Sequence, residues 1–277
     1  MINEPYFPGL DEFYNKFCSA VSQSGEEQRF LTKWGLNALS DVYNILSNNV
    51  QGGYESHKHS MLSIPPLGSV LSIGPGMGFC GFLLSELYDT VIVAEPDGEN
   101  CALLEHISDH YITHKNKNAG RSMRILHAGL SITDEAVTYW KTKQQLMKKR
   151  HLKGSILNFD INGAAELAGV FHEKVSRIYL HKVLSSFSIS GSFESIISAC
   201  ASFLADHGVL TWSEPGYIFK DILASGESSE ETLAHVIKPV FEKNHLELDI
   251  MDYRVSNRNN DMETSLVETW TLLNAKK

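Results

Sequence analysis

The hydrophobic pattern of this chain changes at about residue 65. Across residues 10–48, apolar residues recur at helical spacing, interrupted by the polar stretch 22–27, which predicts two or three helices. Residues 51–66 then contain Gly-Gly, scattered His and Ser, and Pro-Pro. We expect a linker with little helix there.

After residue 66, short apolar runs alternate with helical patterns, which predicts a parallel sheet with right-handed crossovers. Near the carboxyl end two extended stretches are separated only by polar residues, as in an antiparallel hairpin. The predicted strands are residues 70–73, 90–94, 155–159, 177–180 and 209–213, the predicted helices are 79–87, 98–112 and 191–204, and the hairpin strands are 245–254 and 265–274.

The third strand has two candidate positions. Residues 155–159 form a short apolar run, and residues 123–128 are the rival. We favour 155–159, because the rival leaves an unusually long connection before the next strand. This choice implies a long helical insertion at about residues 107–154.

Charge and composition narrow the class of partner. The 277 residues carry a net charge of −9, with one basic cluster at residues 141–153 that is typical of a solvated helix face. This balance disfavours nucleic acid as a partner. The four cysteines have no close spacing, no apolar leader opens the chain, and no apolar run approaches the roughly 20 residues of a bilayer span. We therefore expect a cytoplasmic protein that does not bind membranes.

A glycine-rich turn follows the first predicted strand directly. Gly74, Gly76 and Gly78 alternate in it, so the backbone can adopt positive φ and let a ligand approach closely. The next strand ends in a carboxylate, Glu95, at the place where a ribose would present its two hydroxyls. The two features together predict a nucleotide-type cofactor site.

A dinucleotide turn is the main competing interpretation. Gly76, Gly78 and Gly81 satisfy G-x-G-x-x-G, but that motif has to begin directly after the strand. Counted from Gly74, the sixth position is Phe79. The register therefore argues against NAD.

Over about residues 67–275 the chain resembles the class I S-adenosylmethionine-dependent methyltransferases. The resemblance lies in the turn SIGPGMG, the strand end VIVAEP, NFDIN, IYLHKVL and the closing hairpin. It implies an α/β fold: a Rossmann-like, mostly parallel seven-stranded sheet with an antiparallel last strand, helices on both faces and an amino-terminal helical extension. A finer similarity is to small-molecule N-methyltransferases such as histamine N-methyltransferase, which share L-S-I-G-x-G-x-G and a second strand ending in Glu-Pro.

The resemblance implies S-adenosyl-L-methionine as cofactor, with S-adenosyl-L-homocysteine as product. The glycines would pass under its amino-acid moiety and Glu95 would bind its ribose. Asp160 would accept a hydrogen bond from the adenine, unless residues 127–131 do so. His181 would line the methionine end and is a candidate general base. The implied cofactor residues are Gly74, Gly76, Gly78, Glu95, Pro96, Asn100, Asp160, Ile161, His181 and Val183.

For the acceptor we expect a small molecule, an amine or a heteroaromatic ring. Tyr14, Trp212, Glu214 and Tyr217 are candidates for an aromatic and acidic pocket, although core or surface packing also explains each of them singly. Residues 1–60 would form a helical cap or substrate lid over the cofactor domain, 61–277. His57 and His59 have metal-ligand spacing but no nearby third ligand, so we expect no metal.

Two other functions share these features. One is a cofactor-binding subunit or regulator without activity, and the other is a protein or RNA methyltransferase acting with a partner. The sequence is compatible with a monomer or a homodimer.

Overall fold

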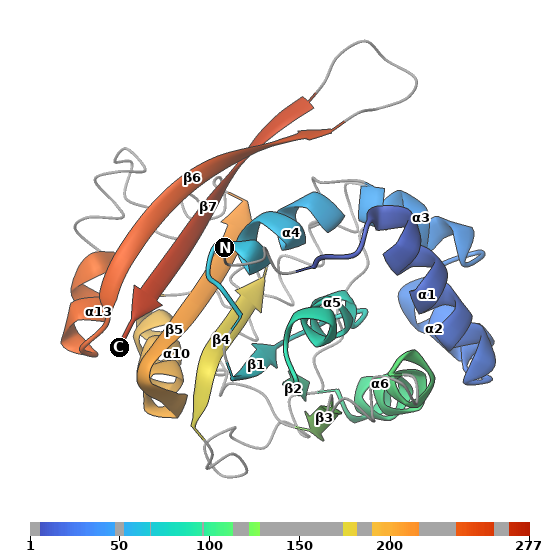
Figure 1. The fold of residues 1–277 in the computed structure, drawn as a ribbon, viewed down its shortest axis with the longest axis horizontal. Helices are drawn as coiled ribbons and strands as arrows, with labels where there is room; N and C mark the ends of the chain where they lie inside the picture. Colours follow the sequence, from blue (N-terminus) through green and yellow to red (C-terminus); the bar gives the residue numbers. More distant parts are fainter. Residues whose placement is uncertain are drawn as a thin grey trace.

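The computed structural model describes residues 6–47, 53–66, 68–95, 97–112, 122–127, 174–181, 190–215, 237–257 and 266–277. Its centre is a seven-stranded sheet in the order β3-β2-β1-β4-β5-β7-β6, with helices on both faces (Figure 1). The strands are β1 (Ser69–Ile73), β2 (Thr90–Glu95), β3 (Ser122–His127), β4 (Val175–His181), β5 (Leu204–Pro215), β6 (Glu247–Asn257) and β7 (Leu266–Lys276).

Strand directions confirm the predicted fold class. β3, β2, β1, β4 and β5 pair in parallel, whereas β7 lies antiparallel between β5 and β6. The pairing of β6 with β7 continues to Asn257 and Leu266, beyond the last pair of β5 with β7, Pro215 with Trp270. The hairpin therefore projects past the rest of the sheet (Figure 1).

The third strand is not where we predicted it. β3, at Ser122–His127, occupies the position beside β2, from the pair Thr90–Ser122 to the pair Glu95–His127. As an edge strand it exposes Ser122 and Arg124, so its sequence lacks the apolar run that marks a central strand. The preferred assignment to residues 155–159 is thus wrong for this position, and those residues lie outside the described part of the chain.

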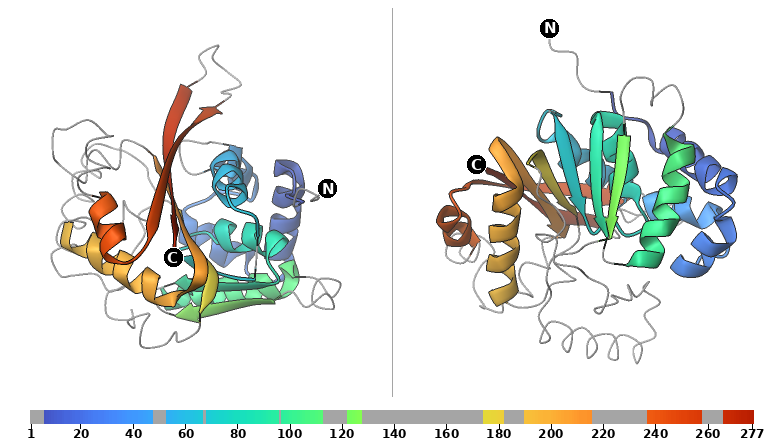
Figure 2. Two further views of the ribbon diagram at one scale, coloured as in Figure 1. Left: turned by 60° about the vertical axis from the view of Figure 1, so that its left-hand side comes forward. Right: turned by 90° about the horizontal axis from the view of Figure 1, so that it is seen from below.

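Helices cover the two faces unequally (Figure 2). On one face lie α5 and α6 with the four amino-terminal helices, and on the other lie α10 and α13. Their bounds are α1 (Leu10–Gln23), α2 (Glu27–Trp34), α3 (Ser40–Ser47), α4 (Tyr54–Leu62), α5 (Phe79–Leu87), α6 (Gly98–Tyr111), α10 (Ser190–Phe203) and α13 (Lys238–Lys243). Within the expected insertion at 107–154, the described residues belong to α6 and β3.

The expected linker contains a helix. α4 occupies Tyr54–Leu62 and packs against β5 and α5. Its buried side includes Ser56, His57 and Ser60, so the helix carries no apolar stripe. The prediction of little helix at residues 51–66 rested on Gly-Gly, Pro-Pro and scattered polar residues, and it was wrong because these polar residues find partners in the core.

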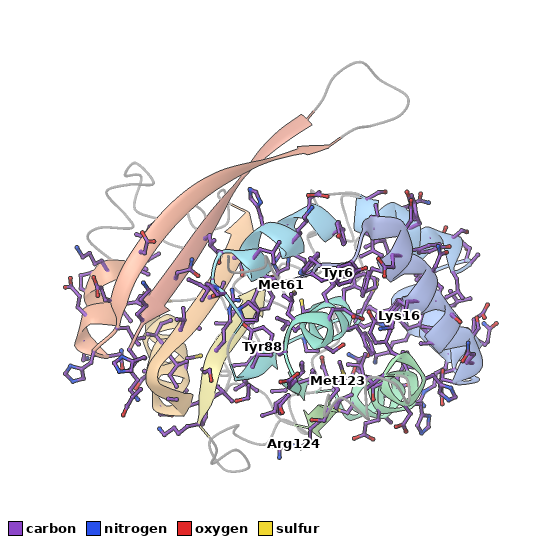
Figure 3. The ribbon with its side chains drawn as sticks, viewed as in Figure 1. Tyr6, Lys16, Met61, Tyr88, Met123 and Arg124 are labelled. Carbon is purple, nitrogen blue, oxygen red and sulfur yellow. The ribbon has the colours of Figure 1, made fainter. Side chains whose placement is uncertain are left out.

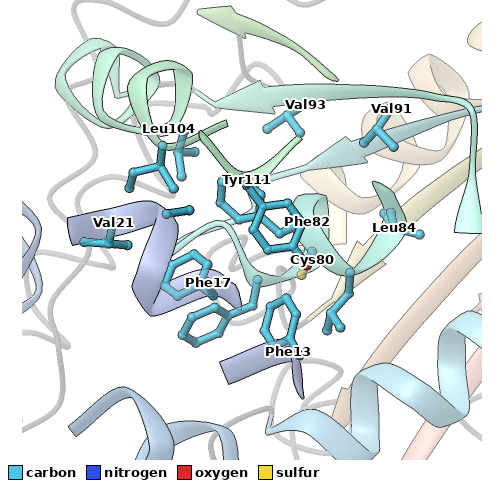
Figure 4. Close-up of a cluster of buried hydrophobic side chains, with 14 of the residues drawn as sticks. Phe13, Phe17, Val21, Cys80, Phe82, Leu84, Val91, Val93, Leu104 and Tyr111 are labelled. Carbon is cyan, nitrogen blue, oxygen red and sulfur yellow. The ribbon is translucent and has the colours of Figure 1, made fainter. Parts of the chain in front are cut away.

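Two hydrophobic clusters fill the two sides of the sheet. Beneath α10 and α13, side chains such as Leu210 and Trp212 pack with residues of both helices. On the other side five rings form what we call the aromatic cluster (Figure 4), namely Phe13 and Phe17 of α1, Phe79 and Phe82 of α5, and Tyr111 of α6. Phe17 is central, with ring centroids 5.2 Å from Phe79 and 5.3 Å from Phe82. In the described residues, no helix is both long and apolar enough to cross a membrane.

Candidate cofactor site at the carboxyl edge of the sheet

The glycine turn lies where β1 ends and α5 begins. Gly74, Gly76 and Gly78 have φ values of 65°, 58° and 93°, a region in which other residues are strained. The Gly74 amide donates a hydrogen bond to Ala94 O at 2.9 Å. This bond fixes the start of the turn beside the end of β2.

The glycines differ in what surrounds them. A Cβ atom on Gly78 would lie 2.5 Å from Leu104 Cδ2 and 2.8 Å from Phe82 Cε2, whereas a Cβ on Gly76 would meet no atom of the described residues within 4 Å. Gly78 therefore permits close packing of the turn on α5 and α6. Gly76 leaves open space along the turn, where a ligand can approach the backbone.

Glu95 and Asn100 lie next to this open space. Glu95 is 6% exposed, and its Oε1 accepts a hydrogen bond from Asp97 N at 3.0 Å. Burial raises the pKa of Glu95 to about 7, although the Asp97 amide and the Asn100 side chain counteract this. A hydrogen-bond donor that comes with a ligand would favour the ionised carboxylate.

Asn100 joins the turn to this carboxylate. Its Nδ2 donates to Gly76 O at 2.8 Å, and its backbone amide donates to Asp97 Oδ1, which caps α6. Asn100 is 1% exposed, and among the described residues its Oδ1 has no hydrogen-bond partner. A buried acceptor without a donor is uncommon and is explained when a ligand supplies the donor.

The amino-terminal helices reach the same site. Lys33 of α2 lies 2.7 Å from Asp97 Oδ2 and 3.8 Å from Glu99 Oε2. The sequence analysis did not identify this contact, because it joins residues more than sixty positions apart. The extension thus holds the turn after β2 as well as covering the sheet.

His181 lies at the end of β4, beside the glycine turn. In the ladders, Leu180 pairs with Ile73 and His181 pairs with Ser213 of β5. His181 is therefore next to the strand end from which Gly74 follows.

α4 presents polar side chains to His181. The His181 Nε2 lies 3.4 Å from Ser56 Oγ, and its Nδ1 lies 3.3 Å from the Tyr179 hydroxyl. The His57 ring stacks on the His181 ring, with centroids 3.9 Å apart and planes inclined by 33°. His57, which the sequence analysis placed in a flexible linker, is in fact 3% exposed.

The Tyr179 hydroxyl connects several of these groups. It lies 3.5 Å from His57 Nδ1 and hydrogen-bonds Ser60 Oγ. His57 Nδ1 in turn lies 3.7 Å from Cys80 Sγ. Burial raises the pKa of Cys80 to about 12, so this thiol is neutral.

Arg177 fastens the carboxyl end of α4. Its Nη1 donates to Met61 O at 2.8 Å and to the Tyr88 hydroxyl at 3.0 Å, and its Nη2 donates to Ser60 O at 2.8 Å. Met61 and Tyr88 are labelled in Figure 3. Arg177 is 2% exposed, and the helix carbonyls provide negative partial charge for the guanidinium.

These contacts form what we call the polar seam, consisting of Ser56, His57 and Ser60 of α4 and Arg177, Tyr179 and His181 of β4. The three β4 residues lie on one face because side chains alternate along a strand. The alternation of Arg177, Tyr179 and His181 with Ile178 and Leu180 was the signal in the sequence that could have revealed the seam.

Of the expected acceptor residues, Trp212 and Glu214 contact each other, whereas Tyr14 packs elsewhere. Tyr14 of α1 packs against Tyr43 of α3, with ring centroids 5.2 Å apart. Trp212 is fully buried in the cluster beneath α10 and α13, and its Nε1 donates to Glu214 Oε1 at 3.0 Å. Trp212 therefore packs in the core, which corrects its expected place in an acceptor pocket with Tyr14.

Several predicted residues lie outside the described part of the chain. Pro96, Asp160, Ile161, Val183 and Tyr217 are among them. Of the alternative adenine segment, residues 127–131, only His127 is described, as the backbone partner of Glu95. In the residues that the structure describes, no group of three or more His, Cys, Asp or Glu side chains is arranged to hold a metal ion.

Comparison with known proteins gives similarities of fold. No model of a known family matches the sequence, and no curated protein matches it. The N-methyltransferase NodS from Bradyrhizobium japonicum WM9, solved with S-adenosyl-L-homocysteine, has 13% identity and a TM-score of 0.48, covering 91% of this chain and 97% of its own. Precorrin-6y C5,15-methyltransferase from Geobacter metallireducens has 10% identity and a TM-score of 0.46, and the match covers 80% of this chain and 87% of its own. A methyltransferase from Methanosarcina mazei has 14% identity and a TM-score of 0.47, and the match covers 76% of this chain and 92% of its own.

The protein from Methanosarcina mazei is an S-adenosylmethionine-dependent methyltransferase, and the other two are methyltransferases by name. With identities of 10 to 14% and TM-scores below 0.5, the likeness concerns the fold. What the site binds has to be judged from its own geometry.

Proposed function

We propose that this chain is a methyltransferase that binds S-adenosylmethionine and methylates a small-molecule acceptor. The observation that carries the proposal is the juxtaposition of the glycine turn with buried Glu95, connected through Asn100. Open space at Gly76 and the unsatisfied Oδ1 of Asn100 fit a ligand that passes along the turn and offers hydroxyl donors.

Different residues of the site would bind different parts of the cofactor. Gly74 and Gly76 would face its amino-acid moiety, and Glu95 and Asn100 would receive its ribose hydroxyls. His181 would lie near the methionine end, beside the start of the turn. When bound, S-adenosylmethionine supplies a methyl group already activated on a sulfonium. The protein has mainly to align the acceptor, exclude water and take up a proton.

A small acceptor carrying an N–H or O–H group fits the electrostatics of the chain. Its net charge of −9 opposes a nucleic-acid partner and favours a cationic or neutral metabolite such as an amine or a heteroaromatic ring. His181 is the candidate general base for deprotonating that group.

Calorimetric titration tests the cofactor. Titrations with S-adenosylmethionine and with NADH are run on the wild type, on Glu95→Gln and on Glu105→Gln. The last variant is the control, because Glu105 is an exposed carboxylate of α6. We expect saturable binding of S-adenosylmethionine that Glu95→Gln weakens at least about tenfold, or 1.4 kcal/mol. Glu105→Gln should bind like the wild type. Absence of binding, or equal affinity in Glu95→Gln, would contradict the proposal, and tight NADH binding would favour the dinucleotide interpretation.

A further inference from the structure

The hydroxyls of the polar seam present lone pairs to the histidines. Ser56 Oγ donates its hydrogen to Gly53 O at 2.7 Å, so the side that it turns to His181 Nε2 is an acceptor. The Ser60 hydroxyl is likewise directed at Ser56 O, at 2.9 Å, and at His57 O, at 3.1 Å. Because a hydroxyl has one hydrogen, both serines are placed to accept hydrogen bonds.

The Tyr179 hydroxyl is shared between the two imidazoles. It lies 3.3 Å from His181 Nδ1 and 3.5 Å from His57 Nδ1. Ser60 Oγ, whose own hydrogen points to backbone carbonyls, accepts the single hydrogen of the Tyr179 hydroxyl. The lone pairs of the Tyr179 oxygen therefore face the two imidazoles, and this oxygen accepts a hydrogen bond from whichever ring carries a proton at Nδ1.

Once one of the two imidazoles, His57 or His181, is protonated, protonation of the other is unfavourable. The two rings are stacked at 3.9 Å, and the guanidinium of Arg177 lies 5.9 Å from the centre of the Tyr179 ring. Cys80 of α5 contributes a neutral thiol, and β5 contributes Ser213, which is uncharged. Of the charged or titratable residues at the other positions of α4, Glu55 and His59 are exposed and Lys58 is half-buried. Two imidazolium ions in contact in a buried site repel each other strongly.

We propose that His57, Tyr179 and His181 act as one unit that holds a single proton, and that this unit takes up the proton released when the acceptor is methylated. The inference rests on the proposed function. The acceptor atom loses its N–H or O–H proton to an imidazole nitrogen and keeps the electron pair. It forms the new bond to the methyl group, whose former bonding pair stays on sulfur. His57 and Tyr179 are then positioning residues that act through His181.

Side-chain nitrogen NMR of the whole protein tests the unit. The histidine resonances are followed between about pH 5 and 9 in the wild type, Tyr179→Phe, His57→Asn and the exposed control His59→Asn. In the wild type we expect His57 and His181 to share two titration steps, separated by more than about one pH unit. In His57→Asn the His181 resonance should follow one step. Tyr179→Phe should move the His181 midpoint by at least about half a unit, and His59→Asn by less than about 0.2 units.

The link to the reaction is tested by comparing the two forms of the cofactor. A sulfonium near the unit disfavours a proton there, and its neutral product does not. We therefore expect the first midpoint to be lower with S-adenosylmethionine than with S-adenosylhomocysteine, by about half a unit or more.

The outcomes separate this inference from the proposed function. Independent single-step titration of His57 and His181, unchanged in Tyr179→Phe, would overturn the unit even where calorimetry shows S-adenosylmethionine binding. Equal midpoints with the two bound ligands would overturn its role in the reaction. Coupled titration without any cofactor binding would contradict the proposed function, and with it the reaction role. If His57→Asn does not fold, the wild type and Tyr179→Phe still decide between these outcomes.

Discussion

The amino-terminal helices meet the rest of the molecule through two very different contacts. α1 packs through the aromatic cluster, in which Phe13 and Phe17 are fully buried against α5 and α6. α4 packs through the polar seam, in which buried hydroxyls, imidazoles and a guanidinium connect it to β4. One chain segment thus uses apolar area in one place and directional hydrogen bonds in the other.

The difference indicates what each contact is for. Apolar packing stabilises in proportion to buried area and tolerates changes of shape. Buried hydrogen bonds contribute less net stability but fix one geometry, since every group has to be matched. The polar seam follows β4 from Arg177 to His181, which lies beside the glycine turn, where orientation would matter for the proposed chemistry. The aromatic cluster supplies the stability.

The largest expected effect is at the centre of the aromatic cluster. Phe17→Ala removes a ring that is 0% exposed and contacts several others (Figure 4). We expect the free energy of unfolding to fall by about 3 to 5 kcal/mol in urea titrations. Phe17→Leu, which keeps most of the volume, should lose less than about 1.5 kcal/mol. A loss below about 1 kcal/mol in Phe17→Ala would mean that the cluster is not the stabilising contact.

The second effect breaks the polar seam. Arg177→Met removes buried hydrogen bonds to two α4 carbonyls and to Tyr88, although the Ser60 carbonyl keeps the Ser63 hydroxyl as a donor. We expect a loss of roughly 3 kcal/mol. The exposed residue Arg124, labelled in Figure 3, provides the control Arg124→Met, which should stay within about 0.5 kcal/mol.

Hydrogen exchange distinguishes the two contacts further. In Arg177→Met the α4 amides should exchange faster than those of α5, because Arg177 donates to backbone carbonyls of α4. Uniform acceleration over both helices would show that α4 is not a separate unit.

The same contrast explains what could be predicted from sequence. α5 has the predicted bounds, Phe79–Leu87, because it follows a glycine turn and is mostly apolar. The turn and Glu95 were predictable since their signals are local: a glycine spacing and a carboxylate at the end of a buried strand. These are features of chain segments that can be read without knowing their neighbours.

Elements that depend on distant partners were missed. α4 buries Ser56, His57 and Ser60 because Tyr179, His181 and Arg177 are opposite them, more than one hundred residues away. β3 is an edge strand whose exposed positions weaken its pattern. The place of Trp212 follows from the alternation along β5, which turns Thr211 to the polar seam and Trp212 to the opposite core.

Glu95 differs from the groups of the polar seam, because it is a buried polar group whose charged form is poorly compensated. Burial raises its pKa from 4.5 to about 7. Below about pH 4.5 the carboxyl is neutral in both the folded and unfolded states, so it costs nothing. As the pH rises to about 7 the unfolded state ionises first, and the folded state loses stability.

Glu95→Gln removes this dependence. Relative to the wild type it should gain nothing near pH 4 and on the order of 2 to 3 kcal/mol above about pH 7, measured by urea titration at both pH values. Glu105→Gln, on the exposed side of α6, should show no such trend. An equal difference at both pH values would mean that the pKa of Glu95 is the same in the folded and unfolded states.

The smallest effects separate stability from binding within the glycine turn. Gly78→Ala places a Cβ against Leu104 and Phe82, the latter part of the aromatic cluster, at a φ of 93°. Gly76→Ala meets no atom of the described residues within 4 Å and has only the strain of its φ of 58°. We expect losses of unfolding free energy of about 2 kcal/mol for Gly78→Ala and about 1 kcal/mol for Gly76→Ala.

Binding should reverse that order. The methyl group of Gly76→Ala would occupy the space along which the cofactor is proposed to pass. Calorimetry should therefore show at least a tenfold weaker affinity for S-adenosylmethionine, about 1.4 kcal/mol. Gly78→Ala, once folded, directs its methyl group into the protein and should bind more nearly like the wild type. If both variants lose affinity only in step with stability, the turn serves packing alone. If Gly76→Ala loses more affinity and Gly78→Ala loses more stability, Gly76 serves ligand binding and Gly78 serves packing of the core.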